Sequence, residues 1–572
     1  MMIPLPSRHL QNKLRHLRLK VLIPALLFAL AVFFTAKSTY YTTEFYLDGD
    51  ASSELVLAHH LAETGQILSS DWYYSTELRV LNTQLVYAPL FHIFSDWHMV
   101  RFTAALIMQA LLVLSFAYLC KQSSLSLGAF FLGAALLISP TSIAYGRIVL
   151  YHCYYMPHII IGFMIVGLYL SSIQKHRQRQ LFSYAVRFFL LITISFLSGL
   201  GGIRQLVITH APLCLLPLFL FFRTESDAPV ISTVSKKRVY LIPAFCAALF
   251  AFVGLVVNIM FLAQQYSFRN NTVITFELID SNGLSNLFYA ILHLFGFQKG
   301  SSLSTIAGIA SLGSVCIAVY CIFLCLRQLL CSPNSVQEYS ASITSLFGIS
   351  VFLILLAIFI IVGSGFAFYH ELYLIPATVW FIPFLCVQYD KSHFSILSFK
   401  IADALLVCVL ILFIPTIGTN IRFFTPHPDS YILRYEGLLY RNSKLVPQLE
   451  KCVQTLSDLG YSLGYSTHWN ANTVTEMTNG QIKMIGLELQ TDDTSTDSID
   501  TLPSLSLKKW LTLKSYLELK PEKVFLLLTS VENKYYLKMP FEDKGEVIYE
   551  DDGNFIIYGF DKPAALYRMI EW

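Results

Sequence analysis

Residues 21–36 read VLIPALLFALAVFFTA, an unbroken apolar run that follows five basic residues, Arg8, Lys13, Arg15, Arg18 and Lys20. No small-residue cleavage site follows this run, so it is interpreted as an uncleaved membrane span and not as a signal peptide. Ten further apolar runs are long enough to cross about 30 Å of hydrocarbon. They lie near 101–120, 124–146, 153–173, 182–201, 206–222, 239–264, 303–330, 341–363, 366–388 and 401–418.

The composition supports this prediction independently. Only 13% of the 572 residues are charged, 55% are hydrophobic, and the mean hydropathy is +0.57. Soluble domains carry roughly 25% charged residues, so the soluble, disordered and nucleic-acid-binding classes are excluded. Residues 1–421 hold 24 basic and 16 acidic residues, whereas residues 422–572 hold 16 and 21. We therefore expect an α-helical polytopic membrane protein of about 11 transmembrane helices with a C-terminal α/β domain.

The basic residues also predict the orientation. With a cytoplasmic segment 1–20 and a membrane domain 21–421, 16 Lys and Arg fall in short inner segments and seven in the longer outer ones. This is the asymmetry of the positive-inside rule. An odd number of spans places the domain at 422–572 outside the cytoplasm. Two further large outer loops are then predicted at 37–100 and 265–302, so any chemistry is expected on the extracytoplasmic face.

The first outer loop carries an acidic motif. Residues 44–66 read EFYLDGDASSELVLAHHLAETGQ, with Asp48 and Asp50 on either side of a glycine. Asp50 is expected to cap a helix over residues 51–64 that Gly65 ends. The apolar positions of this helix share one face, as in a helix lying on a membrane surface. Two carboxylates are thus expected at the lipid–water boundary. The alternative is that Asp50 is only a helix cap and Asp48 only a turn residue.

The order of a first span, an outer loop with an acidic motif and a helix ending in LAETG resembles the GT-C glycosyltransferases. The bacterial relatives of protein O-mannosyltransferases and aminoarabinose transferases are the most similar group. The resemblance lays the acidic residue of that family on Asp50 and implies that one of the two aspartates, Asp50 or Asp48, is the general base. Ala51 stands where the family usually has Glu, so the second carboxylate would be Asp48, and the pair could hold a divalent cation.

The resemblance implies a polyprenyl-phosphate-linked sugar as donor. Such a donor needs cations near the outer ends of the spans, where an unpaired charge is otherwise costly. The predicted topology places five residues there, Arg147, Arg204, His152, His158 and His370. Arginine can bind phosphate oxygens in a bidentate manner. The alternatives are that the arginines are interfacial anchors and that the histidines are ordinary buried residues.

The C-terminal segment alternates helical and strand-like patterns. A helix is predicted at 444–459, strands at 461–466, 523–530 and 554–558, and a second helix at 505–519. A short helix is also expected at 288–297 in the second large outer loop. Residues 464–472, GYSTHWNAN, combine an aromatic ring with amides, which is typical of sugar-binding sites. Trp469 and Asn470 are therefore candidate substrate-binding residues, and Glu371 is a third.

These observations favour an enzyme that transfers a sugar to an acceptor on the outer surface by a single inverting displacement. The acceptor, whether glycan, protein or lipid, stays open. A cell-envelope polysaccharide polymerase or ligase is the nearest alternative, and a transporter or flippase of lipid-linked glycans is another. Membrane lipid is an expected partner and nucleic acid is not. No cofactor is certain.

Overall fold

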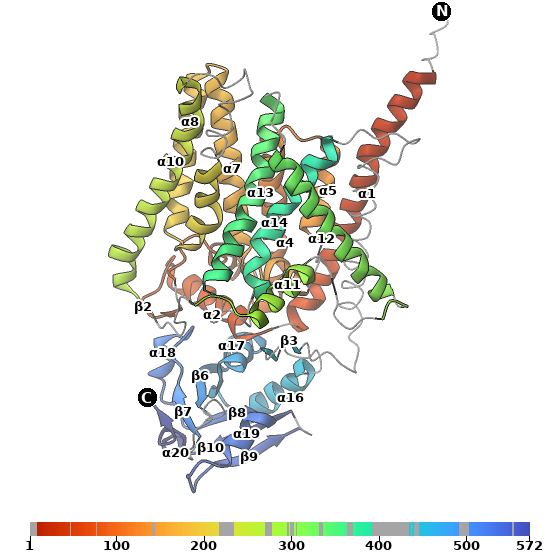
Figure 1. Ribbon diagram of the computed structural model, residues 1–572. Helices are drawn as coiled ribbons and strands as arrows, with labels where there is room; N and C mark the ends of the chain where they lie inside the picture. The colour runs from red at the N-terminus through yellow and green to blue at the C-terminus, as the bar shows by residue number, and fades with distance from the viewer. Residues whose placement is uncertain are drawn as a thin grey trace, which may run out of the picture. The chain divides into compact units, whose positions relative to one another are not determined.

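The chain forms two compact units in the computed structural model (Figure 1). The first unit consists of Met1–Thr39, Ala105–Asn258 and Val273–Thr425, and the second of Tyr40–Ala104, Ile259–Thr272 and Pro426–Trp572. The first large loop thus belongs to the same unit as the C-terminal segment. The structure describes residues 8–45, 47–75, 77–139, 143–216, 234–268, 277–294, 297, 302–304, 306–330, 336–362, 370–391, 434–435, 438–439, 445–490, 503–551 and 554–572.

The first unit is helical. The described helices that contribute to it are α1 (Arg8–Phe45), α4 (Trp97–Gln122), α5 (Leu127–Leu137), α6 (Ile143–Tyr145), η1 (Gly146–Tyr151), α7 (Met156–Arg177), α8 (Leu181–Gly199), η2 (Leu206–His210), α10 (Val234–Val257), η3 (Asn258–Leu262), α11 (Ser281–Leu294), α12 (Ile306–Leu330), α13 (Val336–Ile361) and α14 (His370–Lys391). Within the described residues, seven helices are long and apolar enough to cross a membrane. The protein is therefore a polytopic helical membrane protein.

Seven of the eleven predicted spans correspond to these helices. The prediction of one continuous helix over 124–146 is wrong, because α5 ends at Leu137 and the separate short elements α6 and η1 follow. Pro140 in this stretch disfavours the helical conformation in the residue before it, which explains the break. The run at 206–222 is described as a short helix, Leu206–Leu216, and the run at 303–330 contains α12. The run at 401–418 lies outside the described residues.

Small residues allow the helices of this unit to approach closely. Helices α8 and α10 run side by side (Figure 1), with Gly199 against the backbone of Ala251 and Gly254 against the backbone of Phe196. A side chain at either glycine would collide with the facing helix. Because lipid tails are as apolar as leucine, such backbone contacts are a main source of helix association in membranes.

The second unit contains a seven-stranded sheet with the order β11-β7-β6-β5-β8-β10-β9. Strand β5 pairs in parallel with β6 and β8, β11 pairs in parallel with β7, and the other pairs are antiparallel. The strands are β5 (Leu463–Thr467), β6 (Lys483–Gln490), β7 (Ser504–Leu507), β8 (Val524–Thr529), β9 (Glu546–Glu550), β10 (Phe555–Phe560) and β11 (Ile570–Glu571).

The sheet is covered on both faces. Along β8, Leu526 and Leu528 belong to one buried cluster, whereas Phe525 and Leu527 belong to another that includes Leu449 of α16 (Leu445–Asp458). The second cluster also includes residues of α17 (His468–Met477). A strand buried on both faces is apolar at successive positions instead of alternating, which accounts for the run VFLLL.

The element predictions for this unit are mostly confirmed. The helix at 444–459 is α16, and the strands at 461–466, 523–530 and 554–558 correspond to β5, β8 and β10. The helix predicted over 505–519 is wrong. Its first residues form β7, and only Lys514–Leu517 is helical, as α18. Leu505 and Leu507 alternate with serines, and the strand they form pairs with β6 and β11.

Helix α2 (Gly49–Thr64) begins two residues earlier than the sequence predicted. Asp48, and not Asp50, is the N-cap, because its Oδ1 accepts a hydrogen bond from the Ala51 amide at 2.8 Å. The expected glycine stop is confirmed, since Gly65 has φ of 67°. The next described helix in this loop is α3 (Gln84–Leu90). In the first unit, the helix expected at 288–297 is α11, which begins earlier, at Ser281.

Candidate functional site

The start of α2 packs on the start of α17 within the second unit. A Cβ atom on Gly49 would lie 3.2 Å from Trp469 Cα and closer still to the His468 carbonyl oxygen, so only glycine permits this approach. The contact brings Asp50 Oδ1 to 3.1 Å from His468 Nε2, across 418 residues of sequence. The glycine between the two aspartates is therefore explained by helix packing.

The two partners of this contact differ in exposure. The His468 side chain is 4% exposed, whereas that of Asp50 is 40% exposed. The imidazole is held by rings on two sides: it stacks on Trp510 with centroids 4.5 Å apart and meets Trp469 edge-on at 5.3 Å. A fixed imidazole thus orients a carboxylate that a ligand can still reach. Of the two residues predicted to bind substrate here, Trp469 is 46% exposed and Asn470 is buried.

A buried ion pair between Arg101 and Glu476 holds the first turn of α2 in place. Arg101 is fully buried and binds Glu476 through two hydrogen bonds, Nε to Oε1 at 2.7 Å and Nη2 to Oε2 at 2.6 Å. Its Nη2 also donates to the Ala51 carbonyl at 3.0 Å. Bidentate pairing restricts orientation as well as distance. The position of the Asp48–Asp50 segment is therefore coupled to α17 by this arginine.

A further carboxylate lies one helical turn beyond Asp50. Glu54 is surrounded by Asn82 and Thr83, which donate hydrogen bonds to it, and by Arg79, whose Nη1 is 4.0 Å away. Burial raises the pKa of Glu54, and the nearby Arg79 partly opposes that shift. The site therefore holds a half-exposed carboxylate at the helix start and a more deeply placed, half-buried one a turn further along.

The predicted phosphate ligands lie in the first unit, where two of them are neighbours. Gln205 Nε2 donates to the His158 carbonyl at 2.9 Å and lies 3.3 Å from His158 Nδ1. The adjacent Arg204 guanidinium lies over the Tyr155 ring, 5.6 Å from its centroid. The turn after α8 and the start of α7 thus gather a cation, an imidazole and an aromatic ring.

The other predicted phosphate ligands lie elsewhere in the first unit. Arg147 is half-buried in the π-helix η1, and the buried His152 follows, with its amide donating to the Arg147 carbonyl at 2.9 Å. Single π-helical turns are frequent at functional sites. His370 and Glu371 begin α14, and their side chains lie outside the described part of the structure. The geometry thus groups Arg204 with His158, and Arg147 with His152.

The residues at the start of α2 do not by themselves form a metal site. Within the described residues, no three His, Cys, Asp or Glu side chains gather as metal ligands. Asp48 Oδ1 is engaged as the helix cap, and Asp50 Oδ1 is beside His468. The divalent cation that the aspartate pair could hold stays a prediction.

The sequence did not indicate three of the residues that build this site, namely His468, Arg101 and Glu476. His468 immediately precedes the predicted Trp469 within residues 464–472, so the same polar and aromatic stretch offered a signal for it. Arg101 and Glu476 are 375 residues apart, and neither has a local pattern that distinguishes it from a surface charge. Their pairing is visible only in three dimensions.

No model of a known protein family matches the sequence, and no curated protein matches it. Among solved structures, the crystal structure of the oligosaccharyltransferase of Archaeoglobus fulgidus, a complex with zinc and sulfate, is similar. The match is 14% identical, covers 90% of this chain and 69% of that chain, and has a TM-score of 0.39.

Proposed function

We propose that this protein is an integral membrane glycosyltransferase of the GT-C type. It moves a sugar from a polyprenyl-phosphate donor to a hydroxyl of an acceptor on the extracytoplasmic face. The observation that supports this most is the exposed carboxylate of Asp50, held by the buried His468 at the start of the helix that follows the first candidate span. An accessible acid with a fixed orientation suits a general base.

The proposed reaction is a single displacement. A carboxylate oxygen of Asp50 accepts the proton of the acceptor hydroxyl as that oxygen forms a bond to C1 of the sugar. The bond between C1 and the phosphate oxygen breaks, and its electron pair leaves with the polyprenyl phosphate. The configuration at C1 is therefore inverted. The adjacent His468 and the cap formed by Asp48 hold the base in place, since misplacing a catalytic group by 1 Å is costly.

The donor phosphate is assigned to the cations of the membrane unit. Arg204 with His158, and Arg147 with His152, are two groups that offer positive charge or N–H donors to phosphate oxygens. His370 is a further phosphate ligand in this proposal, with Glu371, Trp469 and Asn470 assigned to the acceptor. The exposed Trp469 ring, which meets His468 edge-on, offers an apolar surface to a sugar face.

The donor assignment is tested by the lipid that the protein retains. Protein purified in mild detergent is expected to carry a polyprenyl phosphate, identified by mass spectrometry of the extracted lipid. Arg204→Gln removes the cation and keeps a hydrogen-bonding side chain, so it should retain less of this lipid. Arg179→Gln serves as control, since Arg179 follows α7 at the opposite end from His158. Equal retention by Arg204→Gln and wild type would place the phosphate elsewhere.

A further inference from the structure

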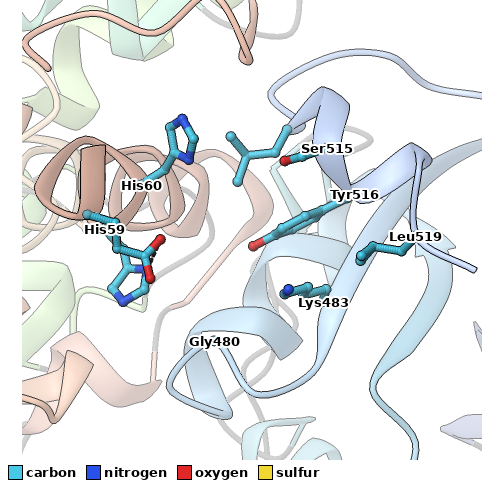
Figure 2. Close-up of a pocket in the computed structure, with 9 residues that line it drawn as sticks. His59, His60, Gly480, Lys483, Ser515, Tyr516 and Leu519 are labelled. Atoms are coloured by element: carbon cyan, nitrogen blue, oxygen red, sulfur yellow. Dashed lines mark ion pairs between the residues drawn. The ribbon is translucent and has the colours of Figure 1, made fainter. Parts of the chain in front are cut away.

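A cavity of about 350 Å³ lies within the second unit, between the second half of α2 and the α/β domain (Figure 2). Its wall includes His59 and His60 on one side and Lys483, Ser515 and Tyr516 on the other. Small-molecule sites in proteins begin at about 300 Å³. The space is therefore large enough for a small polar ligand, and it is separate from the start of α2.

Three polar groups of this cavity are left without a hydrogen-bonding partner among the described residues: the Lys483 ammonium, the Tyr516 hydroxyl and the Glu63 carboxylate. In Figure 2, Lys483 and Tyr516 point from the α/β domain toward α2. The ammonium lies 5.7 Å from the centroid of the Tyr516 ring. Glu63 has a long contact to His59, 3.7 Å from carboxylate to Nδ1, and its side chain is 63% exposed, so it stands at the open side of the cavity. Polar groups at a half-enclosed site favour a ligand that can pair with them.

The charges of the wall are balanced. Lys483 supplies one positive charge and Glu63 one negative charge. Burial lowers the pKa of His59, so its imidazole is neutral at pH 7. Burial, together with the nearby Glu63 and Asp71, raises the pKa of Tyr516, so its hydroxyl remains a donor. An anionic ligand would be repelled by Glu63, and a hydrocarbon chain would leave the half-buried Lys483 ammonium without a polar partner.

A ligand with neighbouring hydroxyl groups can pair with both charged side chains, because each hydroxyl can donate one hydrogen bond and accept another. One can accept from Lys483 while another donates to Glu63. Leu513, Leu519 and the ring of Tyr516 line the same cavity and offer apolar contact. A ligand with hydroxyls around an apolar face is a sugar.

The cavity lies along α2 from the proposed base. Glu63 is thirteen residues after Asp50 in the same helix, which corresponds to about 20 Å at 1.5 Å per residue. We propose that this cavity binds a neutral oligosaccharide, a remote part of an acceptor glycan whose reacting hydroxyl lies at Asp50. This inference rests on the proposed function and deepens it, since it assigns the acceptor to the glycan class.

The test measures binding to the full-length protein in lipid nanodiscs by saturation-transfer NMR. The neutral probes are maltotetraose and chitotetraose, compared with tetragalacturonate and an uncharged Gly-Ser tetrapeptide. A neutral tetrasaccharide should bind. Lys483→Met and Tyr516→Phe should each weaken it about tenfold, the loss of one good hydrogen bond. Lys538→Met is the matched control, because Lys538 lies 5.6 Å from the Tyr535 ring and outside this cavity.

Three results would overturn the inference: neither neutral tetrasaccharide binds, the two cavity variants bind it as wild type does, or a Lys483-dependent signal comes from the uronate or the peptide instead. Asp50→Asn should bind the tetrasaccharide like wild type. If that variant also keeps its turnover, the proposed base fails while the oligosaccharide site stands. If turnover is lost but no oligosaccharide binds, only the acceptor assignment fails.

Discussion

The two ends of helix α2 are built in opposite ways. At the first turn, Asp48 caps the helix, Asp50 meets His468, and Arg101 joins the Ala51 carbonyl to Glu476. At the last turns, His60 Nε2 lies 2.9 Å from Ser69 Oγ and His59 packs on Trp97. Among the described residues, however, Glu63 has only a 3.7 Å contact to His59, and it lines a cavity. The two carboxylates of the first turn are engaged in short contacts, whereas at the last turns the Glu63 carboxylate faces open space.

This difference indicates what each end is suited to do. A catalytic carboxylate must be held within a fraction of an ångström of its productive position, and supporting hydrogen bonds achieve this. A surface that binds a flexible ligand needs unpaired polar groups and room. The same helix provides both. Substitutions at its first turn should therefore affect stability and catalysis, and those at its last turns should affect ligand binding.

The largest effect on stability is expected from Arg101→Met. The variant leaves Glu476 buried without its partner, which costs about 3–5 kcal/mol of unfolding free energy. Denaturant unfolding followed by tryptophan fluorescence measures this loss. Lys508→Met is the control, because the Lys508–Glu488 pair is 3.5 Å long and partly exposed and should cost about 1 kcal/mol or less. Equal losses in the two variants would contradict the role assigned to Arg101.

A smaller effect is expected from the cap. Asp48→Ala removes the acceptor of the Ala51 amide and should cost about 1 kcal/mol, whereas Asp48→Asn keeps a capping oxygen and should cost much less. Hydrogen exchange of the first-turn amides of α2 measures the change locally. Exchange at the last turn, near His59, should be the same in all three proteins. Faster exchange at both ends would mean that α2 unfolds as one piece and that its ends are not distinct.

The smallest effect is a pH dependence from Glu54. Its pKa is raised in the folded state, so above its ordinary value of about 4.3 the folded protein binds more protons than the unfolded one. Stability contributed by this group therefore falls as the pH rises. Relative to wild type, Glu54→Gln should become progressively more stable in thermal unfolding as the pH rises above about 4.3. Parallel curves would show that Arg79, Asn82 and Thr83 fully offset burial.

The sequence predicted the parts of this molecule that depend on local pattern. The apolar spans and strands such as β8 follow from runs of residues whose burial dictates their type. The helix predicted at 505–519 was wrong because its leucines fit a helical spacing as well as the alternation of β7, and only pairing with β6 decides between them. Local pattern also gave the wrong cap, Asp50 instead of Asp48, because both aspartates are good capping residues.

The site was only half predictable for a related reason. Asp50 and Trp469 belong to short motifs that can be recognised alone. The roles of His468, Arg101 and Glu476 depend on contacts across 375 to 418 residues. A single sequence carries no signal that distinguishes a buried arginine from an exposed one. Glu63 and Lys483 were likewise ordinary charges until folding placed them around one cavity.

The most direct test of the central claim is the turnover of Asp50→Asn, with the co-purified lipid donor and release of polyprenyl phosphate as the readout. Asparagine keeps the size of the side chain but cannot accept the proton, so turnover should fall roughly 10²–10⁴-fold. Asp48→Asn, which preserves the cap, should remain active. Turnover of Asp50→Asn within about threefold of wild type, far short of a general-base effect, would contradict the assignment of Asp50 as the base.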